Sequence, residues 1–159
     1  MQVSHSLEPI YNKDSKVLIL GSMPSIKSRE LNFYYANPQN RFWLVLSTLF
    51  NEEIKDRKEF LYKHHIALWD VIKSCDIIGS SDSSIKNVQV NDLNVILRNC
   101  NIKAIFVTGN KAYELYHKYI FKNTNIKAIL LPSPSSANAK CSLNDLVKEY
   151  KKLQDELIL

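Results

Sequence analysis

The sequence predicts an α/β fold, a three-layer αβα sandwich with a mainly parallel central sheet. Short apolar runs alternate with segments of helical periodicity, which is the pattern of strands joined by crossover helices. Two of these runs end in turns of Gly, Pro and Ser, one near each end of the chain. With 159 residues and a hydrophobic share of 45%, the chain is long enough to bury a core, so residues 1–159 are predicted to form one domain.

The N-terminal part begins with a buried strand and a long loop. Residues 17–20 are a continuous apolar run closed by Gly21, which predicts a short strand. Residues 21–39 are predicted to be a loop, and loops of that length in a compact domain are usually functional. Asn40 is placed to cap the helix that follows, since apolar residues then recur at helical spacing. They are Phe42, Leu46 and Leu49.

The middle of the chain is less clearly patterned. Residues 56–64 are amphipathic and predict a helix. Residues 66–72 are apolar but too few for periodicity to distinguish a strand from a buried turn of helix. Residues 73–88 are polar and rich in serine, which predicts a second long loop.

The C-terminal half predicts two further strands alternating with helices. The expected strands are 104–107 and 126–131, and the expected helices are 92–99, 111–121 and 142–157. A loop spans 132–141. Ser142 is the predicted N-cap of the last helix because Asp145 follows three residues later, as in a capping box.

Composition indicates the class of binding partner and the cellular compartment. The net charge of +5 favours a polyanionic partner, although a lysine-rich composition alone produces such a charge. The three cysteines are far apart, so neither a disulfide framework nor a zinc site is expected, and a reduced, cytoplasmic location fits. The polar start of the sequence, residues 1–15, is not expected to be a secretory signal, and no apolar run is long enough to predict a membrane span. The four histidines show no ligand spacing. No metal and no cofactor are therefore expected, and the histidines are predicted to be non-catalytic.

The first Gly-Pro-Ser turn is Gly-Ser-Met-Pro-Ser, residues 21–25. It lacks the three glycines of a dinucleotide fingerprint, and no Gly-Lys-Ser/Thr of a Walker loop follows. An ordinary turn would contain the same residues, since Gly and Pro are common in turns. The second turn, Leu-Pro-Ser-Pro-Ser-Ser at 131–136, is equally common on its own.

The segment Tyr-Ala-Asn-Pro-Gln-Asn-Arg-Phe-Trp, residues 35–43, is more specific. It resembles the Ala-x-Pro-x-Asn-Arg-Phe-Trp segment of the mismatch-specific branch of the uracil-DNA glycosylase superfamily. The Gly-x-x-Pro turn before it and the Pro-Ser loop after it resemble the two active-site motifs of that superfamily, in the same order. The resemblance covers residues 16–140, and the Gly-Ser-Met-Pro form is most similar to the hypoxanthine-DNA (deoxyinosine) glycosylase family.

This resemblance implies a uracil-DNA-glycosylase-like fold and a monofunctional DNA glycosylase that initiates base excision repair. Hypoxanthine is the expected substrate base, with xanthine and uracil as further candidates. The implied catalytic residue is Asn40, which would position a water below the anomeric carbon. The implied base-binding residues are Gly21, Ser22, Met23, Pro24 and Tyr35. The implied DNA-binding residues are Pro132, Ser133, Pro134, Ser135, Ser136, Asn138 and Lys140.

Two positions depart from the better-known relatives. Those relatives have an Asp or Asn in the first motif that orients the water, whereas here Met23 is nearby and no polar equivalent is evident. Leu131 stands where relatives specialised for uracil have His or Asn, so a side-chain donor to the base is absent there, which fits a purine leaving group better. The loop at 79–84 resembles a Gly-Ser-x-Asp stretch of the same family, but its chemistry indicates no role.

Two other functions remain open at this point. The chain could be a nucleic-acid-binding module of the same fold that has lost catalysis, as Met23 and Leu131 permit. It could also be a hydrolase of free nucleosides. For a glycosylase, deaminated DNA is the expected partner, and a monomer is expected because such an enzyme holds a single DNA site.

Overall fold

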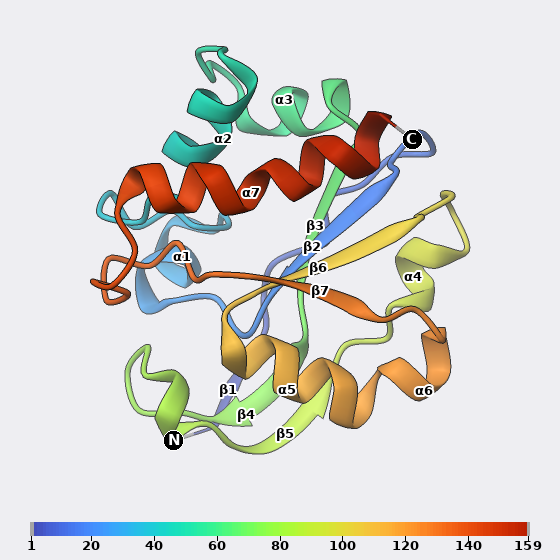
Figure 1. Ribbon diagram of the computed structural model, residues 1–159. Coiled ribbons are helices and arrows are strands. Elements are labelled where there is room, and N and C mark those ends of the chain that lie inside the picture. Colours follow the sequence, from blue (N-terminus) through green and yellow to red (C-terminus); the bar gives the residue numbers. More distant parts are fainter. Residues whose placement is uncertain (1, 159) are drawn as a thin grey trace.

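The computed structural model describes residues 2–158 and contains two sheets (Figure 1). The larger sheet is parallel, with the strand order β3-β2-β6-β7. Its strands are β2 (Val17–Gly21), β3 (Ile66–Asp70), β6 (Ala104–Thr108) and β7 (Ala128–Leu131). Every residue of β2, β3 and β6 is buried, and so are the first and last residues of β7, which explains why these strands appear in the sequence as unbroken apolar runs.

Helices cover both faces of this sheet, as the predicted three-layer arrangement requires (Figure 1). On one face lie α2 (Phe42–Phe50), α3 (Arg57–Lys63) and α7 (Leu143–Ile158). On the other lie α5 (Asn110–Tyr119) and α6 (Phe121–Thr124), and α4 (Asn94–Leu97) precedes β6. The α/β fold class is therefore confirmed. Among the helices within residues 2–158, none has the length and apolar character needed to cross a membrane.

A second, antiparallel sheet was not anticipated. It contains β1 (Gln2–Ser4), β4 (Ile72–Asp76) and β5 (Lys86–Val90) in the order β1-β4-β5. The prediction of one long loop over 73–88 is thus wrong, and only a short 3₁₀ helix (Asp82–Ser84) and its flanks connect the two strands. The strand β5 was missed because it is mostly exposed and carries little apolar signal.

Two local features refine the remaining expectations. The predicted loop at 21–39 contains a helix, α1 (Ile26–Leu31), whose N-cap Ser25 accepts a hydrogen bond from the Ser28 N–H at 3.1 Å. The apolar segment at 66–72 is extended: β3 ends at Asp70, and β4 begins two residues later in the other sheet. The chain therefore changes sheets immediately after Asp70.

The capping box of α7 is confirmed and provides a stability test. The Asp145 N–H donates to Ser142 Oγ at 3.1 Å, and the Ser142 N–H donates to the Asp145 carboxylate at 3.0 Å. We expect Ser142→Ala to lower the free energy of unfolding by about 1 kcal/mol, because an N-terminal N–H of the helix then loses its acceptor. Urea unfolding followed by circular dichroism measures this. Ser142→Asn, which restores an acceptor, should stay close to the wild type, and equal losses in both variants would contradict the capping role.

Candidate active site

The carboxyl ends of three parallel strands meet at one pocket of about 140 Å³. Gly21 ends β2, Asp70 ends β3 and Thr108 ends β6, and all three line this pocket. Ligands of open α/β sheets bind at this edge. The segments after β2 and β7 and the connection between β4 and β5 contribute the rest of the wall, so the two turns that lie far apart in sequence share one cavity.

All of the residues predicted to bind the base line this pocket. They are Gly21, Ser22, Met23, Pro24 and Tyr35. The turn is fixed to the start of the second sheet, because the N–H groups of Val71 and Ile72 donate to the carbonyls of Gly21 and Ser22 at 2.8 and 3.0 Å. These two hydrogen bonds therefore hold the backbone at Gly21, the last residue of β2, and at Ser22, the first residue of the turn.

Tyr35 is fixed within the pocket wall. Its ring stacks on Phe42 with 3.9 Å between centroids and 14° between planes, and its hydroxyl lies 3.1 Å from Thr108 Oγ1. One ring face is thus covered by Phe42, and the side chain also lines the pocket. Burial, with a smaller contribution from the Asp70 carboxylate, raises the pKa of Tyr35, so the residue stays a neutral hydroxyl. The backbone of Tyr35 is left-handed, with φ of 51°, a conformation that is rare for an aromatic residue and is often found at functional sites.

Asn40 lines the pocket with an oriented amide. Its Oδ1 accepts a hydrogen bond from the Phe42 N–H at 2.9 Å, while Arg41 rather than Asn40 occupies the cap position of α2. The predicted link between Asn40 and the helix start is real, but the helix begins one residue later than a cap at Asn40 would require. Because Oδ1 faces the backbone, the amide NH₂ and the second lone pair of Oδ1 remain for a water or a ligand.

The loop after β7 borders a second, larger groove of about 820 Å³ next to the pocket. Of the residues predicted to bind DNA, Ser133, Pro134 and Ser135 line the small pocket, and five line the larger groove. These five are Pro132, Ser133, Ser135, Asn138 and Lys140. Ser136 is exposed and lines neither cavity. The two cavities share Ser80, Asp82, Ser133 and Ser135, so the groove opens beside the pocket.

Comparison with known proteins identifies the family. The model of the uracil DNA glycosylase superfamily matches residues 8–157. The chain belongs to this superfamily. A hypoxanthine DNA glycosylase of Methanosarcina acetivorans is 31% identical over 148 residues, which cover 89% of this chain and 92% of that protein. A protein of the same name from Methanosarcina barkeri (strain Fusaro) is 30% identical over 138 residues, 83% of this chain and 86% of that protein.

A solved structure agrees with this assignment. The solution NMR structure of a protein from Methanosarcina acetivorans, described as a candidate uracil DNA glycosylase, superimposes with a TM-score of 0.78. The match covers 97% of this chain and 99% of that protein, at 28% sequence identity. The uracil-DNA-glycosylase-like fold expected from the two motifs is therefore confirmed.

Within this member of the superfamily, Arg41 joins the 35–43 segment to the Pro-Ser loop. Its guanidinium donates to the carbonyls of Ser135 at 2.9 Å, Asn138 at 3.1 Å and Cys141, and its own N–H donates to the Pro134 carbonyl at 3.0 Å. A planar guanidinium can hold several carbonyls at once, which an ammonium cannot do in the same geometry. These hydrogen bonds fix the loop at 132–141 to Arg41, the residue that follows Asn40.

We expect Arg41→Lys to loosen this loop. The lysine retains the charge but not the fork of donors, so at least one partly buried carbonyl loses its partner at a cost of about 1 kcal/mol. Hydrogen exchange should become faster over 132–141, and the affinity for DNA should fall. Arg98→Lys, on an exposed arginine, is the matched control. Unchanged exchange in the loop of the Arg41 variant would contradict this role.

Two pocket residues, Asp70 and Thr108, are not among the residues that the sequence predicts for the site. Asp70 and Thr108 could have been suspected because each is a polar residue at the carboxyl end of a buried strand. His5, for which the sequence offers no partner, lies 2.8 Å from Asp70. The loop at 79–84 also has a structural place now: Ser22 donates to the Asp82 carboxylate at 2.8 Å.

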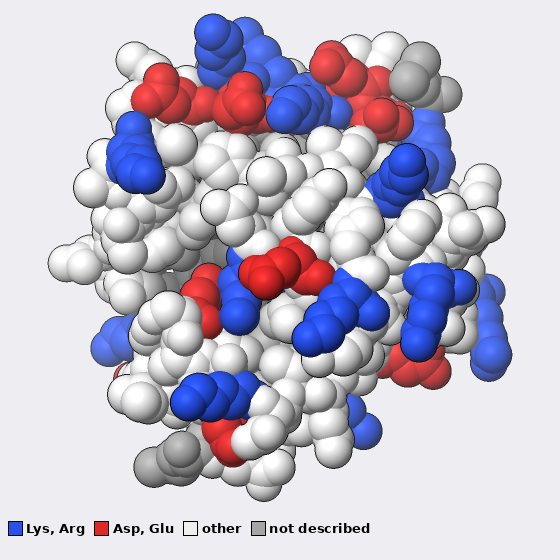
Figure 2. Space-filling view, turned by 60° about the horizontal axis from the view of Figure 1, so that its bottom comes forward, with Lys and Arg blue, Asp and Glu red and all other residues white. Residues whose placement is uncertain are grey.

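Charges of both signs are mixed on the surface. Figure 2 shows lysine and arginine side chains spread over the surface among fewer acidic ones, rather than gathered into a single patch. Partial burial among the surrounding loops raises the pKa of Asp82, which the hydrogen bond from Ser22 and the charge of Lys111 oppose. Within residues 2–158, no group of three or more His, Cys, Asp or Glu side chains is arranged to hold a metal ion.

Proposed function

We propose that this protein is a monofunctional DNA glycosylase that removes deaminated bases, hypoxanthine first, by hydrolysis of the N-glycosidic bond. The observation that carries the proposal is the small pocket at the sheet edge, where the Gly21–Pro24 turn, Tyr35 and Asn40 meet the Pro-Ser loop. An enzyme that acts on a base in DNA must take the nucleotide out of the stack and enclose the base. The small pocket suits the base, and the adjoining groove suits the strand that carries it.

The pocket residues match the needs of the reaction. Glycosidic cleavage passes through an oxocarbenium-like state that a water must then capture. The free amide atoms of Asn40 would hold that water, while backbone N–H groups of the Gly21–Met23 turn would stabilise the departing base. Donors that are already in place for developing negative charge contribute a few kcal/mol.

Two further observations support the monofunctional mechanism and the choice of a purine base. A bifunctional lyase needs an amine nucleophile in the pocket, and no lysine lines it among the residues that the structure describes. Leu131 has a hydrocarbon side chain, is fully buried and does not line the small pocket, so it offers no hydrogen bond to the base. A uracil-type side-chain donor is thus lacking at this position, which favours a purine leaving group. The curated relatives named hypoxanthine DNA glycosylase point in the same direction.

A cleavage assay tests the proposal. Labelled oligonucleotides with one deoxyinosine, deoxyxanthosine or deoxyuridine are incubated with the protein and then treated with alkali, which breaks the strand at abasic sites. We expect strand breaks at deoxyinosine only after alkali. Breaks at deoxyuridine alone would overturn the choice of base, and breaks without alkali would overturn the monofunctional mechanism.

The same samples distinguish the alternatives. Binding to DNA without cleavage of any substrate would favour a non-catalytic binding module. Cleavage of free deoxyinosine that added duplex DNA does not reduce would favour a nucleoside hydrolase.

A further inference from the structure

The loop at 79–84, to which the sequence assigns no role, brings a carboxylate to the mouth of the pocket. The Ser22 hydroxyl donates to Asp82 Oδ1 at 2.8 Å. Ser22 belongs to the first turn and is 8% exposed, so this hydrogen bond ties the loop to that turn. A carboxylate accepts several hydrogen bonds, and the contact with Ser22 uses only part of this capacity. The turn that contains the apolar Met23 thus receives a charged group from another part of the chain.

Hydrogen bonds hold the loop that carries Asp82. The Ile78 N–H donates to Ser84 Oγ at 2.8 Å, and the Ser84 hydroxyl donates to the Ser81 carbonyl at 2.7 Å. The Ile26 N–H, at the start of α1, donates to Ser80 Oγ at 3.0 Å. The carboxylate is therefore already in place before a ligand binds, and such preorganisation makes a charge effective in catalysis.

Asp82 lies where the small pocket meets the larger groove. If the base occupies the pocket and the strand occupies the groove, the sugar that joins them lies along residues that line both cavities. Of the residues within 2–158 that line both, three are serines and the fourth is Asp82. The charged side chain at this junction would therefore face the sugar of the enclosed nucleotide.

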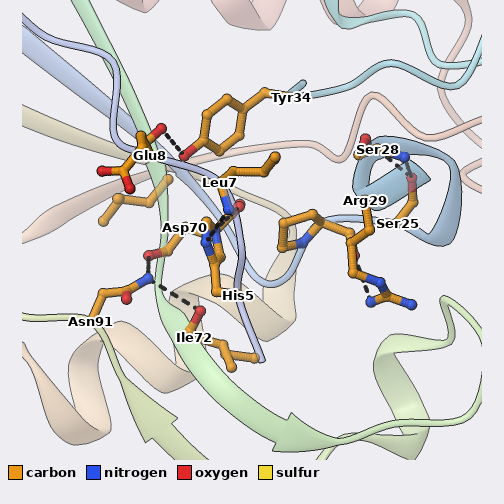
Figure 3. Close-up of polar contacts among 12 residues, drawn as sticks. His5, Leu7, Glu8, Ser25, Ser28, Arg29, Tyr34, Asp70, Ile72 and Asn91 are labelled. Carbon is orange, nitrogen blue, oxygen red and sulfur yellow. Dashed lines mark hydrogen bonds and ion pairs between the residues drawn. The ribbon is translucent and has the colours of Figure 1, made fainter. Parts of the chain in front are cut away.

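The second carboxylate of the pocket occupies a different place. Asp70 is 3% exposed and lines the small pocket but not the groove. Its Oδ2 lies 2.8 Å from His5 Nε2, and its carbonyl accepts from the Asn91 amide at 2.9 Å (Figure 3). Asp70 therefore belongs to the buried part of the pocket, whereas Asp82, which is exposed, belongs to its mouth.

A negative charge at the mouth suits the charge that the reaction creates. When the glycosidic bond breaks, its electron pair leaves with the base, and positive charge develops on C1′ and O4′ of the sugar. DNA bound in the groove would cover Asp82 and exclude water, which strengthens the attraction between the two charges. The attacking water then adds to C1′, and its proton ends on the departed base. Asp82 is thus a carboxylate both before and after the reaction.

We propose that Asp82 is a further catalytic residue whose carboxylate stabilises the positive charge on the sugar in the transition state, with Ser22 as its positioning residue. This inference rests on the proposed glycosylase function and adds a second group to Asn40, which would hold the water. The same carboxylate would lie beside the phosphates of the bound strand and repel them. Removal of the charge should therefore change the rate and the affinity in opposite directions.

Asp82→Asn tests this expectation. The amide oxygen can still accept from Ser22, so the variant removes the charge and keeps the shape and the hydrogen bond. We expect the single-turnover rate on deoxyinosine duplexes, at saturating enzyme, to fall about a hundredfold. The affinity for undamaged duplex should rise about two- to fivefold, as for the loss of one exposed charge contact. A wild-type rate, or a parallel loss of rate and affinity, would overturn the proposal.

A cationic abasic analogue tests the charge without any reaction. The probes are duplexes with one pyrrolidine nucleotide, whose protonated ring nitrogen carries a positive charge, or one neutral tetrahydrofuran nucleotide. A group that stabilises the transition state also binds its analogue. Fluorescence anisotropy should show that the wild type prefers the cationic duplex by about ten- to hundredfold, and Asp82→Asn should lose most of this preference. An unchanged ratio in the variant, or a wild-type ratio of one, would overturn the proposal.

Two further substitutions complete the test. Glu114→Gln removes one negative charge from an exposed residue of α5 that lines neither cavity, so it is the matched control and should keep the rate and the ratio. Ser22→Ala should reduce the ratio in the wild-type background but not in Asp82→Asn, because Ser22 would act through the carboxylate. Equal reductions in both backgrounds would overturn the positioning role of Ser22.

The outcome for the wild type separates this inference from the proposed function. If the wild type cleaves deoxyinosine while Asp82→Asn keeps the wild-type rate and ratio, only the role of Asp82 is overturned. If the wild type neither cleaves deoxyinosine nor binds either abasic duplex above undamaged DNA, both are overturned.

Discussion

Asn40→Ala should reduce the rate of base removal by at least about a hundredfold while DNA affinity changes only a few-fold. A residue that positions or polarises the attacking water typically contributes between 10² and 10⁴ in rate. Asn40 is the amide-bearing side chain of the 35–43 segment that reaches the pocket, and its Oδ1 is held by the Phe42 N–H. The larger groove, which would hold the strand, does not include Asn40, so binding should persist.

Asn37 provides an unusually close control for this variant. Its Oδ1 also accepts the N–H two residues ahead, from Gln39 at 2.9 Å, the same distance as in the Asn40 contact. Asn37 does not line the pocket. Each alanine variant therefore removes a local hydrogen bond of the same kind. A difference between their single-turnover rates then measures the contribution of Asn40 to bond cleavage. Equal rates in both variants would contradict a catalytic role for Asn40.

The sequence predicts those parts of the fold that depend on local pattern. The strands β2, β6 and β7 are continuous apolar runs, and α7 is announced by Ser142 and Asp145. By contrast, β1 has only three residues, and β5 is mostly exposed, so neither produces a periodic signal. The antiparallel sheet depends on pairing between these strands and β4, and the residue pattern of a single segment cannot predict such long-range contacts.

The candidate site divides in the same way. The sequence predicts Asn40, Tyr35 and the two turns as site residues because each lies in a segment that resembles a family motif. The parallel sheet then brings them to one pocket. His5 and Asp70 are 65 residues apart in the sequence. They meet because β1 pairs with β4, which brings the N-terminal segment alongside the end of β3. A sequence pattern cannot show that pairing, although a polar residue at the end of an apolar strand is a usable hint.

Gly21→Ala should destabilise the protein by about 1–3 kcal/mol and block the pocket, because it inserts a methyl group into a filled space. The new Cβ would lie 2.5 Å from Asp70 Oδ1, 3.2 Å from the Tyr35 hydroxyl and 3.6 Å from Thr108 Oγ1. The first distance is far below van der Waals contact. The φ of Gly21 is not positive, so the cost comes from this crowding and not from backbone strain.

Asp70 cannot easily give way to that methyl group, since its other oxygen is bound to His5 and the side chain is buried. A double-mutant cycle makes this argument quantitative. The cost of Gly21→Ala, measured by urea unfolding, should be at least about 1 kcal/mol smaller in an Asp70→Ala background, where the opposing oxygen is gone. Additive costs would show that the methyl group is accommodated elsewhere. A strong coupling would show that the glycine of the first motif and the carboxylate at the end of β3 are packed as one unit, so that neither can be changed without reshaping the floor on which the base would rest.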